Sequence, residues 1–248
     1  MAEATVDPRI TDIIEAGVNR LGLFLPHFTA TPAGAVNPKG PGIVAHELMG
    51  AIARNLNVTV RLAGLANPPK AIEALNAGEI DVMFTGIVAS RRTLIAFTDP
   101  VVQFDYAYLV PAGSPIAESA EVDRPGRRIS VVDGHASTMA LEGLIAHAEL
   151  VRSDVPEKAF ALFCDGGADV FAVPRMELFD YAETLPGSRI LAQGFGINTV
   201  GFAVAKDKSA RLEFIEDRLA EAKAAGRIEQ ILEDFGLVDL GFSVPGAP

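Results

Sequence analysis

The stretch DVMFTGIVASRRTLIAFTDP, residues 81–100, decides how this chain is interpreted. Its first residues belong to a short apolar run, Ile80–Phe84, which is typical of a strand buried on both faces of a parallel sheet. Ligands of such sheets lie beyond the carboxyl ends of the strands, so we expect residues 86–92 to line a binding site. Arg91 and Arg92 lie in that segment, and guanidinium groups are suited to holding a carboxylate or a phosphate. The alternative is an arginine pair that is simply solvated at the surface.

Composition limits the class of protein to which this chain can belong. Its 248 residues are 49% apolar and 21% charged, which is ordinary for a globular protein of one large domain or two modest ones. The net charge of −11 argues against a nucleic-acid-binding surface, because phosphate binding needs clustered lysine and arginine. Cys164 is the single cysteine, which excludes an intrachain disulfide, and no Cys/His spacing resembles a zinc site. We therefore expect no metal and no cofactor. We also expect no membrane-spanning helix, because no apolar run approaches the ~20 residues that such a helix needs.

Hydrophobic periodicity predicts alternating helices and strands. Val44, Leu48, Ile52 and Leu56 recur every four residues, as on one face of a helix, and residues 58–62 then alternate as in a strand. This order predicts a doubly wound α/β layer. We expect further helices over residues 7–16, 69–77, 137–147, 155–163, 209–225 and 227–235, further strands over 20–25, 80–84, 106–111, 128–132, 169–173 and 201–205, and a loop over 29–41.

The order of several motifs resembles that of the family 3 extracellular solute-binding proteins, which have the type 2 periplasmic-binding fold. The family's Ala-Leu-x-x-Gly-x-x-Asp block corresponds to residues 74–81, its carboxylate-binding arginine to Arg91, and its Phe-(Ser/Thr)-x-Pro corner to residues 97–100. The resemblance extends from Asn19 to about Gly236. It implies two lobes, each a mostly parallel sheet flanked by helices, joined by two hinge strands. The lobes would be residues 1–107 with 201–248, and residues 108–200, and a ligand would lie between them.

The resemblance also implies the candidate ligand contacts. In the first lobe they are Arg91, with Arg92 as its neighbour, Gly86, Val88 and Phe28, although a phenylalanine is more often a core residue. In the second lobe they are the turn Gly134, His135 and Ala136, whose backbone N–H groups would face an anion, and Arg175, for which a solvated position at a helix start is equally compatible.

Some family positions are changed in this chain, and the changes bear on the ligand class. His135 stands where the family has a hydroxyl, and Pro174 stands where amino-acid binders have an acidic residue that pairs with the ligand's amino group. We therefore expect a carboxylate without a free α-amino group, such as a dicarboxylate or an aromatic acid. In the alternative, Glu47, Asp133 or Asp105 supplies the missing anion.

Two other functions fit the same fold. One is a dehydratase similar to cyclohexadienyl dehydratase, in which Glu47, Asp133 or Glu177 would act as a general acid. The other is a ligand-sensing module. No nucleophile and base set, G-x-S-x-G, P-loop or H-E-x-x-H pattern supports catalysis, so we expect no enzymatic activity. His27, His46 and His135 lie near predicted edges of the site, but we do not expect them to form a metal site.

Partners and location are also expected from the resemblance. It implies a monomer that delivers its ligand to an ABC permease in the periplasm. Residues 1–17 lack the basic end and apolar stretch of a secretory signal, so the cytoplasm remains the alternative.

Overall fold

The computed structural model describes residues 7–24, 27–31 and 34–246. Two compact units are present. The first runs through Val102, includes Val200–Leu237 and resumes at Val244, and the second comprises Gln103–Thr199 and Val238–Ser243. Strands β7 (Val102–Val110) and β12 (Gly196–Ala205) carry the chain from the first unit to the second and back. Residues 238–243, expected in the first lobe, belong to the second unit.

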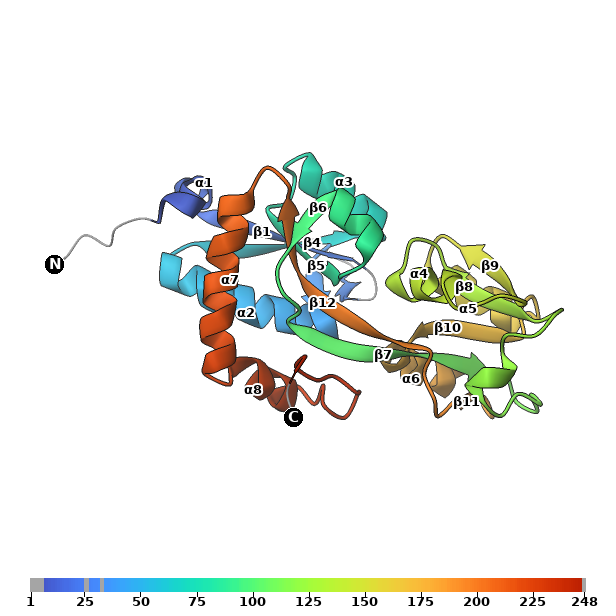
Figure 1. Ribbon diagram of the computed structural model, residues 1–248. Coiled ribbons are helices and arrows are strands. Elements are labelled where there is room, and N and C mark those ends of the chain that lie inside the picture. The colour runs from blue at the N-terminus through green and yellow to red at the C-terminus, as the bar shows by residue number, and fades with distance from the viewer. Residues whose placement is uncertain (1–6, 25–26, 32–33, 247–248) are drawn as a thin grey trace. The chain divides into compact units, whose positions relative to one another are not determined.

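The sheet of the first unit has the strand order β4–β1–β5–β12. Strand β1 (Val18–Phe24) pairs in parallel with β4 (Thr59–Leu65) and β5 (Val82–Gly86). Strand β12 is antiparallel both to β5 and to β6 (Ile95–Phe97). Helix α2 (Pro41–Leu56) leads into β4 and α3 (Pro68–Asn76) into β5, and they cover opposite faces of the sheet (Figure 1). All five residues of β5 are buried, as a strand covered on both faces requires.

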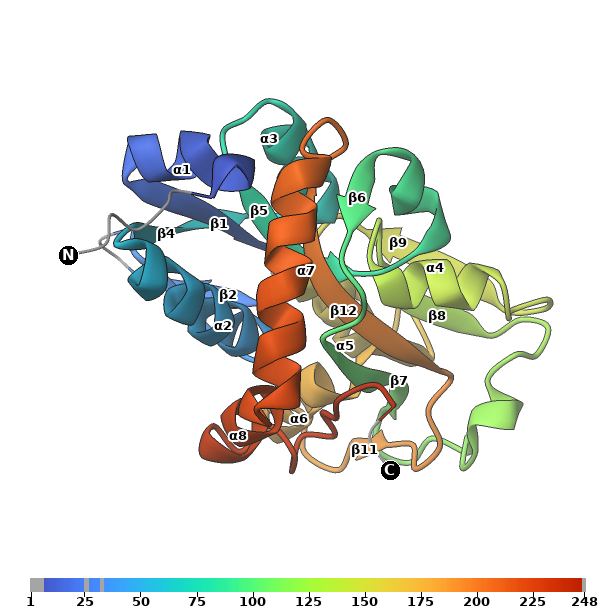
Figure 2. The same ribbon diagram turned by 60° about the vertical axis from the view of Figure 1, so that its left-hand side comes forward.

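The core of the first unit follows from side-chain alternation along these strands. Met83 of β5 faces α3, in a cluster with Phe24, Ile72, Leu75, Ile95 and Phe97. Phe84 faces the other way and packs on Phe202, with the ring centroids 4.8 Å apart. The remaining elements of this unit are η1 (Pro8–Ile10), α1 (Thr11–Ala16), β2 (Phe28–Ala30), β3 (Val36–Pro38), η2 (Ala89–Thr93), α7 (Ser209–Ala224) and α8 (Arg227–Asp234). Figure 2 shows α8 at the C-terminal end of α7.

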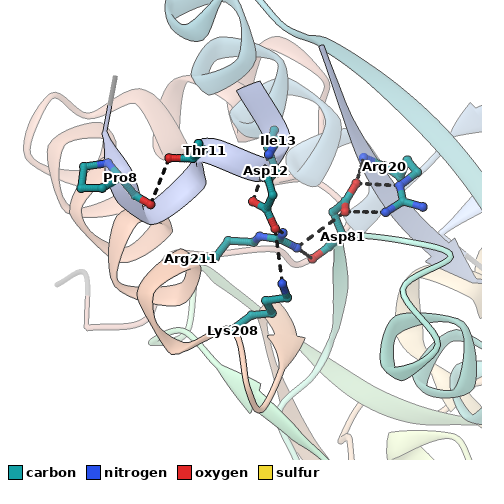
Figure 3. A network of polar contacts seen from close by, with 8 residues as sticks. All are labelled: Pro8, Thr11, Asp12, Ile13, Arg20, Asp81, Lys208 and Arg211. Carbon is teal, nitrogen blue, oxygen red and sulfur yellow. Dashed lines mark hydrogen bonds and ion pairs between the residues drawn. The ribbon is translucent and has the colours of Figure 1, made fainter. Parts of the chain in front are cut away.

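An ion-pair network at the amino end of β5 ties these elements together (Figure 3). Asp81, just before β5, accepts two hydrogen bonds from the Arg20 side chain, at 2.7 and 2.8 Å. Arg211 of α7 donates from Nη1 to the Asp81 carbonyl at 3.0 Å and from Nη2 to Asp12 Oδ2 at 2.6 Å. Lys208 Nζ also reaches Asp12 Oδ2, at 3.4 Å. The network thus joins α1, β1, the start of β5 and α7.

The sheet of the second unit has the strand order β7–β10–β8–β9. Strands β8 (Arg128–Val132), β9 (Glu149–Ser153) and β10 (Val170–Pro174) are parallel, whereas β7 is antiparallel to β10 and to β11 (Arg189–Ile190). Along β10, Val170 and Ala172 face a cluster that contains Leu141, and Phe171 and Val173 face one that contains Phe163. These clusters involve α4 (Ala136–Glu142), on one side, and α5 (Pro156–Cys164) and α6 (Arg175–Thr184) on the other; η3 (Ser119–Glu121) completes the unit.

The structure confirms the α/β class and nearly all predicted elements, with ends shifted by a few residues. Gly17 ends α1 with φ = 66°, a left-handed conformation that glycine adopts without strain. The predicted first strand included Leu25, which lies outside the described residues together with Pro26. No helix in the described part of the chain is long and apolar enough to cross a membrane.

Three expectations about elements were wrong. Residues 29–41 are not simply a loop, since β2 and β3 pair in an antiparallel hairpin; positions 32 and 33 lie outside the described residues. Helix 137–147 ends at Glu142, because the Asp123 carboxylate accepts the N–H groups of residues 146–148 and holds that segment away from a helical path. The short strands β6, β9 and β11 were missed.

Candidate functional site

The candidate site of the first unit is built at the carboxyl end of β5. After Gly86 the chain passes Val88 and enters η2, where the Arg91 N–H donates to the Val88 carbonyl at 3.1 Å. The Arg91 side chain turns back toward the strand. Its Nη1 donates to Thr85 Oγ1 at 2.7 Å and to the Gly86 carbonyl at 3.1 Å, and the residue is only 3% exposed. A guanidinium is thus placed where parallel sheets bind ligands.

Close packing over the end of β5 depends on Gly201 of β12, which lies opposite Thr85. A Cβ at position 201 would be 3.0 Å from Thr98 Oγ1 and 3.1 Å from both the Asp99 carbonyl and Ile87 Cδ1. The missing side chain therefore lets the segments that follow β5 and β6 approach the strand end on which Arg91 rests.

The adjacent arginines have different environments. Arg92 is exposed, and its guanidinium lies 5.7 Å from the centroid of the Phe97 ring, a surface cation–π contact. Gly86 is buried and Val88 half-buried. Of the pair, only Arg91 is placed as a desolvated cation.

Phe28 and His27 pack into the first unit. The Phe28 ring covers β4 so closely that a Cβ at Gly64 would lie 2.6 Å from it. The His27 ring lies 4.3 Å from that of Phe24, and a Cβ at Gly42 would overlap the His27 carbonyl. Both side chains are more than nine-tenths buried, so packing accounts for their positions.

In the second unit, the predicted turn joins β8 to α4. Gly134 has φ = 70°, His135 is the N-cap residue and is buried, and Ala136 begins the helix. The Thr138 hydroxyl donates to the Val132 carbonyl at 2.5 Å and holds the first helical turn on the strand. Ser137 was not singled out from the sequence, yet it is 1% exposed and its Oγ has no hydrogen-bond partner among the described residues. In the sequence, its position in the first helical turn after a glycine was the one feature that could have identified it as a candidate.

The Arg175 side chain donates hydrogen bonds to one carboxylate and two backbone carbonyls. Its Nε donates to Asp105 Oδ2 at 2.7 Å, Nη1 to the Leu191 carbonyl at 3.0 Å and Nη2 to the Ala192 carbonyl at 3.0 Å. All three nitrogens are thus bonded within the second unit, where the side chain joins the start of α6 to β7 and to the segment before β12. These contacts favour a stabilising role over the expected ligand contact.

The candidate acids have different partners within their own units. Asp133 lies 3.1 Å from Arg152, and Glu47 lies 3.6 Å from His46 and 4.0 Å from Arg227. Glu177 is buried in the first turn of α6. Within residues 7–24, 27–31 and 34–246, no group of three or more His, Cys, Asp or Glu side chains could hold a metal ion.

Comparisons with known proteins agree with this architecture. The family model of the bacterial extracellular solute-binding proteins, family 3, matches residues 29–238. A search of curated proteins finds no match.

Solved structures of the same fold cover nearly the whole chain. A variant of the arginine-binding protein ArgBP from T. maritima is 22% identical, with a TM-score of 0.74 over 92% of this chain and 98% of that one. The solute receptor for L-cysteine of Neisseria gonorrhoeae is 19% identical, with a TM-score of 0.76 over 91% and 92%. An ancestral amino acid-binding protein, a precursor of cyclohexadienyl dehydratase, is 20% identical, with a TM-score of 0.76 over 91% and 98%.

Proposed function

This chain belongs to the bacterial extracellular solute-binding proteins, family 3, and from that premise we propose that it captures a small carboxylate-bearing solute through Arg91. Binding without chemical conversion is the activity for which the family is mainly known. Delivery of the solute to an ABC permease outside the cytoplasm completes the proposal. A gene position beside permease and ATPase genes would support this partner, and a position beside genes for a signalling protein would favour the sensing module.

The observation that carries the proposal is the burial of the Arg91 guanidinium at the end of β5. Removing a charge from water is costly, so a buried guanidinium must be held by hydrogen bonds, and the carboxyl end of a strand in a parallel sheet is where ligands bind. Thr85 and Gly86 hold Nη1 through uncharged oxygens at 2.7 and 3.1 Å. A carboxylate offers the planar, doubly accepting partner that a guanidinium binds best.

The ion pairs of the candidate carboxylates Asp105, Asp133 and Glu47 support a ligand without a free α-amino group. An ammonium in a desolvated site needs an anionic partner. Pro174 cannot supply one, and Asp105, Asp133 and Glu47 already have cations beside them, namely Arg175, Arg152 and Arg227. A keto acid, a dicarboxylate or an aromatic acid makes no such demand.

A thermal-shift screen of matched acids tests the proposal. The pairs are 2-oxoglutarate with L-glutamate and phenylpyruvate with L-phenylalanine, with succinate and L-arginine added. A ligand at ~100 times its dissociation constant should stabilise the protein by about 2.7 kcal/mol. We expect the acid that lacks the amino group to give the larger shift in at least one pair. A larger shift from the amino acids would contradict the proposed ligand class, and no shift from any carboxylate would contradict the proposal as a whole.

A turnover assay separates binding from catalysis. The purified protein is incubated with prephenate and with arogenate, and product formation is followed by absorbance. We expect no product above the rate without protein. Steady, protein-dependent formation of product would favour the dehydratase alternative.

A further inference from the structure

The Arg91 guanidinium is held in part by Thr85, a side chain that the sequence did not single out. An arginine side chain has several rotatable bonds, so a recognition arginine must be held in one orientation before it can bind a carboxylate through two parallel hydrogen bonds. Arg91 Nη1 is held by two acceptors, the Thr85 hydroxyl and the Gly86 carbonyl. The carbonyl belongs to the backbone, whereas the hydroxyl can be removed by a side-chain substitution.

Thr85 is itself rigidly placed. It is fully buried within β5 and lies opposite Gly201 in the ladder with β12. A β-branched side chain in a strand has few allowed rotamers, so its hydroxyl occupies a defined position. The 2.7 Å distance to Nη1 is that of a short, charge-assisted hydrogen bond.

We propose that Thr85 is the positioning residue for Arg91: its hydroxyl fixes the plane of the guanidinium and so sets the affinity for a carboxylate without touching the ligand itself. This inference rests on the proposed function for the affinity effect, but the fixing of the guanidinium is independent of any ligand. Thr85→Val keeps the shape of the side chain and removes the hydroxyl. Thr85→Ser keeps the hydroxyl and removes a methyl group.

Thr98 offers a matched control. It is also buried, at 2% exposed, and also lies in the first unit. Its hydroxyl donates to the Asp99 carbonyl at 2.9 Å and accepts the Phe202 N–H at 3.1 Å, so it bonds to the backbone of its neighbours. Thr98→Val therefore reports what the loss of a buried threonine hydroxyl does to this unit in general.

The first measurement needs no ligand. In protein with nitrogen-15 in its arginines, NMR spectra show the Nη resonances of Arg91, assigned by their absence in Arg91→Lys. We expect slow rotation about the Cζ–Nε bond in the wild type, in Thr85→Ser and in Thr98→Val, and rotation at least tenfold faster in Thr85→Val. Equal rotation in Thr85→Val and the wild type would overturn the inference.

The second measurement uses sodium acetate, a small probe that presents a carboxylate and only a methyl group besides. Its dissociation constant is read from the shifts of the Arg91 resonances. We expect about a tenfold increase in Thr85→Val, as loss of one hydrogen bond to a charged group predicts, and less than a twofold change in Thr85→Ser and Thr98→Val. An equal increase in Thr98→Val would mean that a general loss of packing, and not positioning, caused the effect. If acetate leaves Arg91 unchanged in the wild type while its rotation still depends on Thr85, the proposed function fails and the positioning role stands.

Discussion

Strand β5 has a buried arginine at each end, and the two have different surroundings. At the amino end Arg211 is 6% exposed and lies in the ion-pair network of Figure 3, where Asp12 and Asp81 are its partners. At the carboxyl end Arg91 is 3% exposed, and Nη1 donates to a hydroxyl and a carbonyl.

The comparison shows that burial of an arginine does not by itself indicate a binding site. Strand direction distinguishes the two positions. Parallel sheets bind ligands at the carboxyl ends of their strands, which is the end that Arg91 occupies. The acids around Arg211 instead join four segments of the first unit, as a stabilising network does. We therefore expect substitutions at the two ends to affect different properties.

Replacing the carboxyl-end arginine should have the largest effect. Arg91→Ala removes the charged partner of a desolvated carboxylate, which we expect to weaken ligand binding by about a thousandfold, or about 4 kcal/mol. Calorimetry with the tightest ligand of the screen measures the affinity, and urea unfolding checks the fold. The matched control is Arg92→Ala, for which the exposed cation–π contact predicts a change below threefold. Unchanged affinity in Arg91→Ala would mean that another residue binds the carboxylate, and Arg92 would be the first candidate.

Replacing the amino-end arginine should act on stability instead. Arg211→Ala leaves Asp81, which is buried, with one cation fewer, and we expect a loss of about 3 kcal/mol in the free energy of unfolding. Ligand affinity should change by less than threefold. Arg218→Ala on the same helix, whose ion pair with the exposed Glu221 is partly solvated, should lose less than about 1 kcal/mol. A large loss of affinity with intact stability in Arg211→Ala would contradict the division of roles.

Arg175 extends the comparison to the second unit. Arg175→Ala leaves Asp105 without this cation and removes the donors to the Leu191 and Ala192 carbonyls, so we expect a loss of about 2 kcal/mol in stability. Ligand affinity should stay within threefold of the wild type. An affinity loss like that of Arg91→Ala, without a change in urea unfolding, would restore Arg175 as a ligand cation.

Acid should weaken the Arg211 network by a smaller amount. Burial raises the pKa of Asp12, but the charge of Arg211, the hydrogen bond and charge of Lys208 and the Ile13 N–H lower it, and the net pKa lies below the ordinary 3.8. A lowered folded-state pKa gives stability that is complete above about pH 3.8 and is lost as the pH falls through the folded-state value. Asp12→Asn should therefore lose under about 1 kcal/mol at pH 7, since the Asp12 side chain is half-exposed, and should show a shallower loss of stability between pH 5 and pH 2. Parallel acid profiles of the two proteins would show that Asp12 does not contribute.

The local sequence predicted the framework on which both arginines are placed. The all-apolar run of β5, the four-residue repeat of α2 and the stop at Gly17 depend on neighbours in sequence, so they could be read directly. Motif order predicted the family, which the family model confirms. The hairpin of β2 and β3 was missed because each strand is three residues long and is fixed by its partner and by packing, not by periodicity.

What the sequence by itself determined is therefore the order of helices and strands and the position of an arginine pair after β5. Only the tertiary structure decided which arginine of the pair is buried, because that depends on how η2 turns back over the strand end beside Gly201, more than 100 residues away in sequence. It also decided that Arg175 pairs with Asp105, 70 residues earlier, and that Thr85 holds Arg91. A local pattern determines which side chains a segment presents. The partner of a charged side chain is determined by the distant segment that folds beside it. The reason is that an unpaired charge becomes costly only when folding removes it from water.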